Sequence, residues 1–252
     1  RLLARKQQGL IRECHGDLHL GNIVMFDGDP MIFDGIEFNP GLRWIDVLSD
    51  VGFLTMDLTR LGRSDLAHWF LDAYLAHTGD YTGLPLLRLY EVYRALVRAK
   101  VDAMRATQRD LSSAHRIRIV AEYRRYLRVA EAFTRPGMRG LVITRGVSAS
   151  GKSTLTGEIL SRLPAVRVRS DVERKRLAGL DPLAPALSRY GTGIYSPHMT
   201  ERTYGRLAEV AGQILDAGWI AIIDATFLTR ELRQRFAALA ASYDVPFVIL
   251  NC

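Results

Sequence analysis

The sequence predicts two domains: a mainly α-helical one over residues 1–135 and an α/β one with a parallel sheet over residues 136–252. Up to about residue 133, most apolar residues recur at steps of three and four, the period of an amphipathic helix. Beyond a break at residues 135–140, short apolar runs alternate with helical patterns, which indicates parallel strands joined by right-handed crossovers. With 252 residues, 48% of them hydrophobic, each half can bury a core.

In the first half, residues 1–13 predict the end of a helix running into a strand. Two short apolar runs, 23–26 and 30–33, flank Asp27-Gly28-Asp29 and predict a hairpin. Helical patterns then cover residues 44–61, 64–77, 85 to about 104, and 113–133. Two apolar stripes are expected to be core, namely Leu86, Tyr90, Tyr93, Val97, Val101 and Met104 on the third helix and Ile119, Tyr123, Leu127 and Ala130 on the fourth.

The second half alternates strands and helices in a regular order. Strands are predicted over residues 141–144, 166–169, 219–223 and 246–250. Helices are predicted over residues 152–163, 197–218 and 231–242. This order is typical of a sheet whose functional residues gather at the carboxyl ends of its strands.

Composition limits the partners. The chain has 34 basic and 27 acidic residues, a net charge of +7, and only four of the basic residues are lysine. An arginine-rich surface suits anionic substrates such as phosphates. The densest basic run, residues 116–128, has the spacing of a solvated helix face, so nucleic acid is the less favoured partner. Oligomeric state leaves no signal in the sequence.

The cysteine content and the hydropathy of the sequence indicate in which cellular compartment the protein is expected. The two cysteines, Cys14 and Cys252, lie at opposite ends and form no framework, which favours a cytoplasmic protein. No stretch of 18 apolar residues occurs, so no membrane partner is expected. Because the chain begins at Arg1 and stops directly after a predicted strand, we expect it to be a piece of a longer protein.

A phosphate-binding motif follows the first strand of the second half. Residues 146–153, Gly-Val-Ser-Ala-Ser-Gly-Lys-Ser, fit the pattern G-x-x-x-x-G-K-[ST]. Consecutive amides of such a loop form an anion nest at a helix N-terminus. Lys152 is expected to reach the β- and γ-phosphates of ATP, and Ser153 to hold Mg²⁺ through its hydroxyl. The cofactor-binding set is Gly146, Ser150, Gly151, Lys152, Ser153 and Thr154.

Two acids and an arginine follow the neighbouring strands. Asp171 is predicted to accept a proton from a substrate hydroxyl, and Arg174, one turn later, to hold a substrate anion; the alternative is a helix cap followed by a solvated basic turn. Asp224 ends the third strand, where an acid orients Mg²⁺. These residues resemble the small-molecule P-loop kinases of the gluconate kinase, adenylylsulfate kinase and zeta-toxin type over about residues 140–252. The resemblance implies a lid and a last strand beyond Cys252.

A second phosphoryl-transfer pattern lies in the first half. His15-Gly16-Asp17 and Asn22 precede the hairpin, and Asp34 follows it. This is the order that a kinase needs: Asp17 would accept the hydroxyl proton, while Asn22 and Asp34 would hold Mg²⁺ on the ATP phosphates. His15 is expected to orient the loop rather than act as a base.

Residues 15–54 resemble the aminoglycoside phosphotransferase family, which also holds choline and fructosamine kinases. The corresponding loop of that family has the pattern HGDLHxGN, and residues 15–22 of this chain have the sequence HGDLHLGN. The resemblance covers about residues 1–133 and implies a protein-kinase-like carboxyl lobe, with an amino lobe that this chain lacks. It also implies that Asp46 is structural and braces the catalytic loop.

The pairing of the two halves is similar to bacterial bifunctional aminoglycoside phosphotransferase/ATP-binding proteins, which implies a parent about twice as long. The leading hypothesis is an enzyme that transfers the γ-phosphoryl of Mg·ATP to a hydroxyl of a sugar, an aminocyclitol or a similar small molecule. The alternative is a nucleotide-gated binding or regulatory module with a degenerate kinase lobe. A toxin-like kinase acting on a nucleotide sugar is a third possibility.

Overall fold

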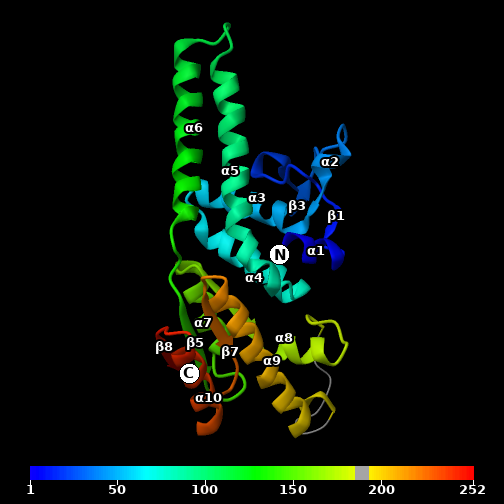
Figure 1. Ribbon diagram of the computed structural model, residues 1–252, viewed down its shortest axis with the longest axis vertical. Coiled ribbons are helices and arrows are strands. Elements are labelled where there is room, and N and C mark those ends of the chain that lie inside the picture. The colour runs from blue at the N-terminus through cyan, green and yellow to red at the C-terminus, as the bar shows by residue number, and fades with distance from the viewer. Residues whose placement is uncertain (185–192) are drawn as a thin grey trace. The chain divides into compact units, whose positions relative to one another are not determined.

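The first elements of the chain are short and pair across a long stretch of sequence. The computed structural model describes residues 1–184 and 193–252 (Figure 1). Helix α1 (Leu2–Gln7) leads into β1 (Ile11–Glu13), which pairs antiparallel with β4 (Trp44–Asp46). The helix predicted over residues 44–61 is therefore wrong at its start, because Trp44–Asp46 form a strand and α3 (Val47–Arg60) begins only after it.

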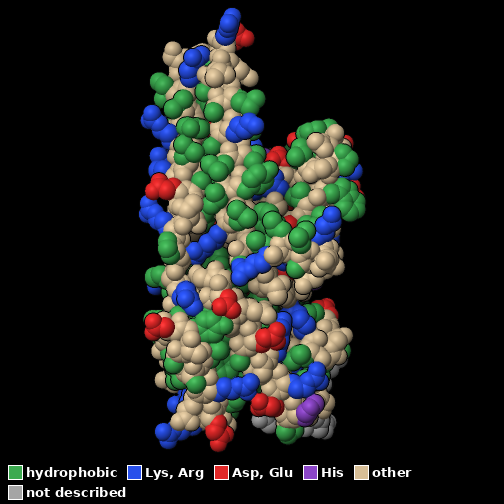
Figure 2. Space-filling view, viewed as in Figure 1, with side chains coloured by type: hydrophobic (Ala, Val, Ile, Leu, Met, Phe, Trp, Pro, Cys, Tyr) green, Lys and Arg blue, Asp and Glu red, His purple; other side chains and the backbone are tan. Residues whose placement is uncertain are grey.

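The predicted hairpin is confirmed, but the three-residue turn expected at Asp27-Gly28-Asp29 is wrong, because Asp29 pairs with Phe26 and leaves a two-residue turn. The turn η1 (Leu20–Asn22) leads into β2 (Ile23–Phe26), which pairs antiparallel with β3 (Asp29–Ile32), and Asp27 and Gly28 both adopt positive φ at the turn. Helix α2 (Pro40–Arg43) precedes β4. Apolar side chains of the hairpin are exposed. Figure 2 shows hydrophobic side chains gathered at the upper right of the view, where Figure 1 labels β3. They are Val24, Met25, Phe26, Met31 and Ile32.

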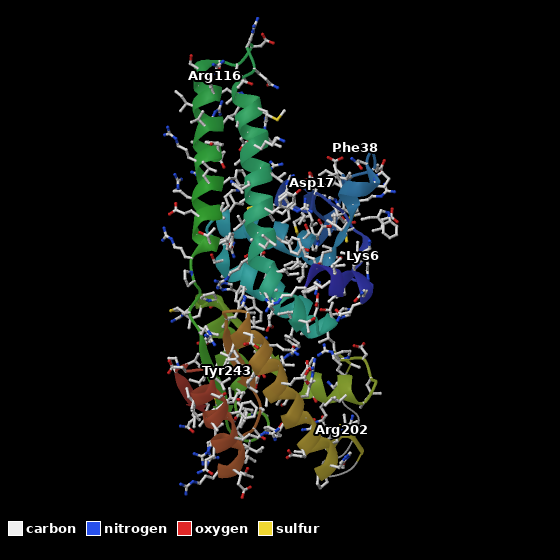
Figure 3. All side chains as sticks on the ribbon, viewed as in Figure 1. Lys6, Asp17, Phe38, Arg116, Arg202 and Tyr243 are labelled. Carbon is white, nitrogen blue, oxygen red and sulfur yellow. The ribbon has the colours of Figure 1, made fainter. Side chains whose placement is uncertain are left out.

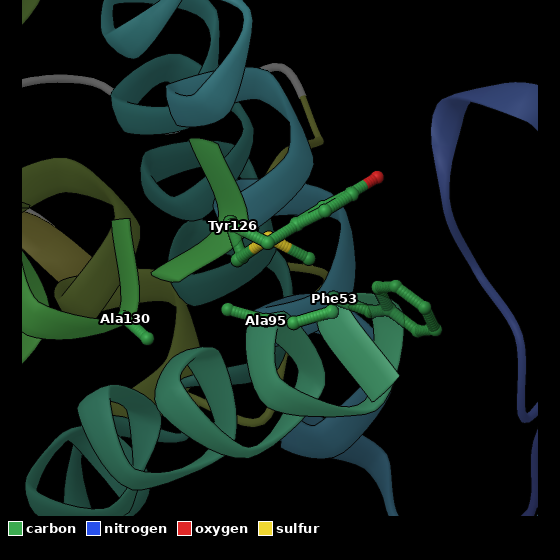
Figure 4. Packing of buried hydrophobic residues seen from close by; sticks show 6 residues of the cluster. Phe53, Ala95, Tyr126 and Ala130 are labelled. Atoms are coloured by element: carbon green, nitrogen blue, oxygen red, sulfur yellow. The ribbon is translucent and has the colours of Figure 1, made fainter. Parts of the chain in front are cut away.

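Helices α4 (Ser64–Thr78), α5 (Leu84–Ala106) and α6 (Ser113–Thr134) agree with the predicted helices; the turn η2 (Tyr81–Gly83) precedes α5. Figure 1 shows α5 and α6 side by side and antiparallel. Their core with α3 is drawn in Figure 4. It contains Phe53 and Met56 from α3, Ala95 and Ala99 from α5, and Tyr126 and Ala130 from α6.

The stripe predicted to be core on α5 is right in part. Leu86 is buried and Tyr90 and Val97 are half-buried, but Tyr93, Val101 and Met104 are exposed. Ala95 and Ala99 are buried instead, because small alanines let α5 approach its neighbours closely, and apolar periodicity gave them no weight. On α6, Ile119 and Ala130 are buried as predicted, but Leu127 is exposed.

The second half forms a four-stranded parallel sheet, as the alternating pattern predicted. Its strands are β5 (Gly140–Arg145), β6 (Ala165–Arg169), β7 (Ile220–Asp224) and β8 (Phe247–Asn251), in the spatial order β6-β7-β5-β8. Between them run α7 (Lys152–Arg162), α8 (Ser170–Leu177), η3 (Gly193–Tyr195), α9 (Pro197–Asp216) and α10 (Arg230–Ser242). All pairings are parallel, so the carboxyl ends of the strands share one edge.

The chain divides into two compact units that do not follow the sequence order exactly. The first unit holds residues 1–67 and 83–136, and the second holds residues 68–82 and 137–252. Residues 68–82, which are most of α4 and the start of η2, thus group with the sheet. Within the described residues, no helix is both long and apolar enough to span a membrane.

Candidate functional site

The phosphate loop connects β5 to α7 at the carboxyl edge of the sheet. Two residues in it adopt positive φ, Ala149 at 64° and Gly151 at 88°, which closes the loop directly before the helix. A Cβ at Gly146 would lie 2.5 Å from Ser150 Oγ, so only glycine fits there. The Gly146 amide donates to Thr226 O (3.1 Å), which ties the loop to the end of β7.

Lys152, the first residue of α7, is buried and turns its ammonium into the loop. Its Nζ donates to Val147 O and lies 3.4 Å from Ser150 Oγ. The cation therefore sits against the backbone that would cradle a phosphate, at the positive end of a helix. The predicted loop residues Gly146, Ser150, Gly151 and Lys152 thus come together, and Thr154 lies exposed one turn into α7.

Ser153 and Asp224, which the sequence assigned to Mg²⁺, are in contact. Ser153 Oγ donates to Asp224 Oδ2 (2.7 Å), and Asp224 is buried at the end of β7. A hydroxyl and a carboxylate are oxygen ligands of the kind Mg²⁺ takes, alongside phosphate oxygens and water. The donor set therefore fits a magnesium–nucleotide complex. In residues 1–184 and 193–252, no group of three or more His, Cys, Asp or Glu could hold a metal ion.

Asp171, the predicted base, is the second residue of α8, which directly follows β6, the strand next to β7. Its Oδ2 accepts from Lys175 Nζ (2.5 Å) and its Oδ1 from the Tyr195 hydroxyl (3.0 Å), while about half of the side chain stays exposed. Both oxygens of the Asp171 side chain are therefore held in place by hydrogen bonds. Burial and the bond to Asp171 raise the pKa of Tyr195 above its ordinary value.

Arg174, predicted to hold a substrate anion, lies in α8 and is buried. It donates to Ile194 O (3.0 Å) and Thr200 Oγ1 (3.2 Å), and its guanidinium lies 5.1 Å from the centre of the Tyr195 ring. These contacts connect Arg174 to η3 and the start of α9. Arg174 is thus bound to η3 and α9 and lies against the Tyr195 ring, contacts that sequence reasoning did not foresee.

Sequence reasoning also missed two buried charged residues of the second unit. Arg167 in β6 pairs with Asp72 of α4, and Glu173 accepts from Arg176 and from Tyr81 Oη (3.2 Å). The sequence showed only a charge at each position, Arg167 inside a predicted strand and Glu173 in the charged run that follows it. Asp72 and Tyr81 lie 95 and 92 residues from these partners along the chain, which no local pattern reveals, whereas Arg176 is only three residues from Glu173.

In the first unit, the structure brings Asp17, Asn22 and Asp34 together. Asn22 Nδ2 donates to Asp17 O (3.0 Å) and lies 3.3 Å from Asp17 Oδ2 and 3.5 Å from Asp34 O. The Phe33 amide donates to Asn22 O (3.0 Å), which closes the hairpin onto the loop. Asp34 adopts a positive φ of 61° and is exposed. Figure 3 labels Asp17.

Two histidines orient this loop. Gly21 N donates to His19 Nδ1 (3.0 Å), while His19 Nε2 lies 3.2 Å from Arg98 Nη1 and bonds Asp17 Oδ2 (3.3 Å). This bond is the main cause that lowers the pKa of Asp17, against the opposing effect of burial. His15 Nε2 bonds Phe33 O (2.9 Å) while its Nδ1 accepts from Asp17 N (3.3 Å), which is the orienting geometry expected of it.

Asp50, not Asp46, braces the loop. Asp50 Oδ2 accepts from Gly16 N (3.0 Å), and Arg94 donates to Gly16 O (2.8 Å). Asp46 instead pairs with Arg5 (2.5 Å) and accepts from Leu48 N (3.0 Å), which caps α3. The expectation for Asp46 is therefore correct about a structural role and wrong about the place, because the strand β4 moves Asp46 away from the loop.

Comparison with known proteins supports an assignment for the second half of the chain. Residues 141–252 match the family model described as AAA domain, which supports a nucleotide-binding P-loop unit. An uncharacterized protein of Mycobacterium bovis and two of Mycobacterium tuberculosis are each 31% identical over 248 residues, or 98% of this chain. The chain spans about half (49%) of the length of these relatives.

Proposed function

We propose that the second unit binds Mg·ATP and transfers its γ-phosphoryl to a hydroxyl of a small molecule, such as a sugar or an aminocyclitol. The observation that carries this proposal is the 2.7 Å contact between Ser153 and Asp224 beside the buried Lys152. It joins a phosphate loop, a hydroxyl and a strand-end carboxylate, which is the combination that P-loop enzymes use for a magnesium–nucleotide complex.

The chain's own residues supply the remaining roles. Lys152 leaves its contact with Val147 O for the β- and γ-phosphates, and the loop amides bind the same oxygens. Bound Mg²⁺ would neutralise phosphate charge. Asp171 accepts the proton of the acceptor hydroxyl, and Lys175 and Tyr195 hold its carboxylate in place until then. Catalysis then rests on positioning and charge neutralisation.

The first unit is proposed to be a second phosphoryl-transfer lobe of the aminoglycoside phosphotransferase type. The convergence of Asp17, Asn22 and Asp34 supports this, with Asp17 as the base and the other two residues on the metal side. The pKa of Asp17, lowered chiefly by the hydrogen bond from His19, keeps its carboxylate in the ionised form that a base requires. The whole protein is proposed to act in the cytoplasm, with the acceptor as its small-molecule partner.

Calorimetric titration of Mg·ATP into the chain tests the proposal. We expect a site that Lys152→Ala abolishes and that Asp34→Asn leaves unchanged, because Asp34 belongs to the first unit. Lys100→Ala, at an exposed lysine of α5, is the matched control and should bind as the wild type does. No binding by the wild-type chain, or equal binding by Lys152→Ala, contradicts the assignment.

Release of ADP with a panel of sugars and aminocyclitols then separates the two function classes. Turnover that depends on an acceptor hydroxyl supports the kinase. Binding or slow hydrolysis that no acceptor accelerates indicates the nucleotide-gated module instead.

A further inference from the structure

A segment from the first half of the sequence is built into the P-loop unit. Residues 68–82 lie outside the matched stretch 141–252, yet they group with it in space. His68 Nδ1 bonds Leu160 O of α7 (2.9 Å). The Trp69 indole covers Gly157, where an added Cβ would lie 2.9 Å from the ring. The segment therefore packs directly on the helix that follows the phosphate loop.

At the centre of this contact is a buried ion pair. Asp72 Oδ2 accepts from Arg167 Nη2 (2.7 Å) and Asp72 Oδ1 from Arg167 Nε (3.3 Å), while the guanidinium lies 5.4 Å from the centre of the Trp69 ring. The two residues are 6% and 7% exposed. A two-point pair of this kind fixes the plane of the guanidinium, and neither charge is tolerated there without the other.

The opposite edge of the same guanidinium reaches the proposed magnesium ligands. Arg167 Nη1 donates to Ser153 O (3.1 Å) and to Thr156 Oγ1 (3.3 Å). The Thr156 hydroxyl lies 3.5 Å from Asp224 Oδ2, the oxygen that also accepts from Ser153. A continuous set of contacts thus runs from Asp72 through Arg167 to the Ser153–Asp224 pair.

We propose that Asp72 and Arg167 are positioning residues for the Ser153–Asp224 pair, so that residues 68–82 control how strongly nucleotide binding depends on Mg²⁺. The proposal rests on the proposed function of the second unit. Asp72 neutralises Arg167 and holds it on the Ser153 carbonyl. Without that carboxylate, Arg167 is an unpaired buried cation whose charge acts on Asp224 and opposes a second cation beside it.

The test is ATP affinity of the full chain, measured with Mg²⁺ and again in excess chelator. Asp72→Asn preserves the shape and removes the charge. We expect it to weaken Mg·ATP binding about tenfold and metal-free ATP binding less than twofold. Tyr81→Phe is the matched control, because it removes another buried contact of the same segment, the bond to Glu173, without touching Arg167. It should change neither affinity.

An equal loss with and without Mg²⁺, or an unchanged Mg·ATP affinity in folded Asp72→Asn, overturns the proposal. Hydrogen exchange without nucleotide gives a second, independent readout. In Asp72→Asn the amides of residues 153–157 should exchange faster, and in Tyr81→Phe they should not. Faster exchange confined to residues 68–82 also overturns it. Should the wild type bind no Mg·ATP, the proposed function fails, and this exchange result decides the coupling alone.

Discussion

Ser153 in the first turn of α7 and Asp224 at the end of β7 meet through a 2.7 Å hydrogen bond, although 71 residues separate them. The parallel pairing of β5 with β7 brings the two positions to one edge of the sheet. The contact places two oxygen atoms of the kind that Mg²⁺ binds next to each other, beside the phosphate loop.

Asp224→Asn tests this relationship directly. The amide keeps the size of the side chain but removes the charge that would face the metal, so we expect Mg·ATP affinity to fall about tenfold or more, near 1.4 kcal/mol per factor of ten. Calorimetry at several Mg²⁺ concentrations measures it. Asp110→Asn, at an exposed aspartate, should have no effect. An affinity for Mg·ATP that survives Asp224→Asn excludes Asp224 from the magnesium site.

The Arg5–Asp46 pair should dominate the stability of the first unit. Both side chains are buried, and Asp46 also caps α3 and accepts from the Tyr90 hydroxyl (3.0 Å). Asp46→Ala leaves Arg5 without its carboxylate and should cost about 3–5 kcal/mol of unfolding free energy. Urea unfolding measures this cost. Glu131→Gln, at the exposed pair with Arg135, should cost about 0.5 kcal/mol or less; a similar cost for both variants would contradict the prediction.

Glu91 should make the first unit less stable as the pH rises. It is fully buried in α5, with a 2.7 Å bond from Thr55 Oγ1, and burial raises its pKa to about 8. A carboxyl whose pKa is raised on folding contributes stability that is complete below its unfolded value, near 4.5, and lost as the pH rises toward about 8.

Between pH 5 and pH 8 this contribution should amount to about 3 kcal/mol. Glu91→Gln is uncharged at every pH, so it should flatten the stability profile and exceed the wild type at pH 8. Denaturant unfolding across this range, followed by a probe in the first unit, checks it. Glu37→Gln, at an exposed position, should leave the slope unchanged. A slope that persists in Glu91→Gln would assign the pH dependence to another group.

His19 should set the protonation of Asp17. The hydrogen bond from its ring is the largest cause that lowers the pKa of that carboxyl, so His19→Ala should raise the Asp17 pKa toward its ordinary value. Carboxyl chemical shifts followed between pH 2 and 7 report the change. His77→Ala, at an exposed histidine of α4, should not change the pKa of Asp17. An unchanged Asp17 titration in His19→Ala would show that Asn22 and Arg98 suffice to lower the pKa of Asp17.

Features carried by contiguous residues were predictable. The phosphate loop needs glycines, a lysine and a hydroxyl at fixed spacing between a strand and a helix, and all of that information lies in residues 141–163. The hairpin at Asp27-Gly28 and the order of strands and helices in the second half follow equally from local patterns. Apolar periodicity was only partly right on α5, because it gives no weight to alanines and paired charges.

Contacts between distant residues were decided by the tertiary structure alone. Because β1 pairs with β4, Trp44–Asp46 form a strand instead of the predicted helix start. The residue that accepts the hydrogen bond from Gly16 of the loop is Asp50, not Asp46. Asp72 meets Arg167 across 95 positions of the chain. A charged residue carries no mark of its partner in the sequence, since the pair is stable only where packing excludes water from both groups. The sequence by itself thus determined which chemical groups this protein carries, and the packing of its helices and strands decided which of them act together.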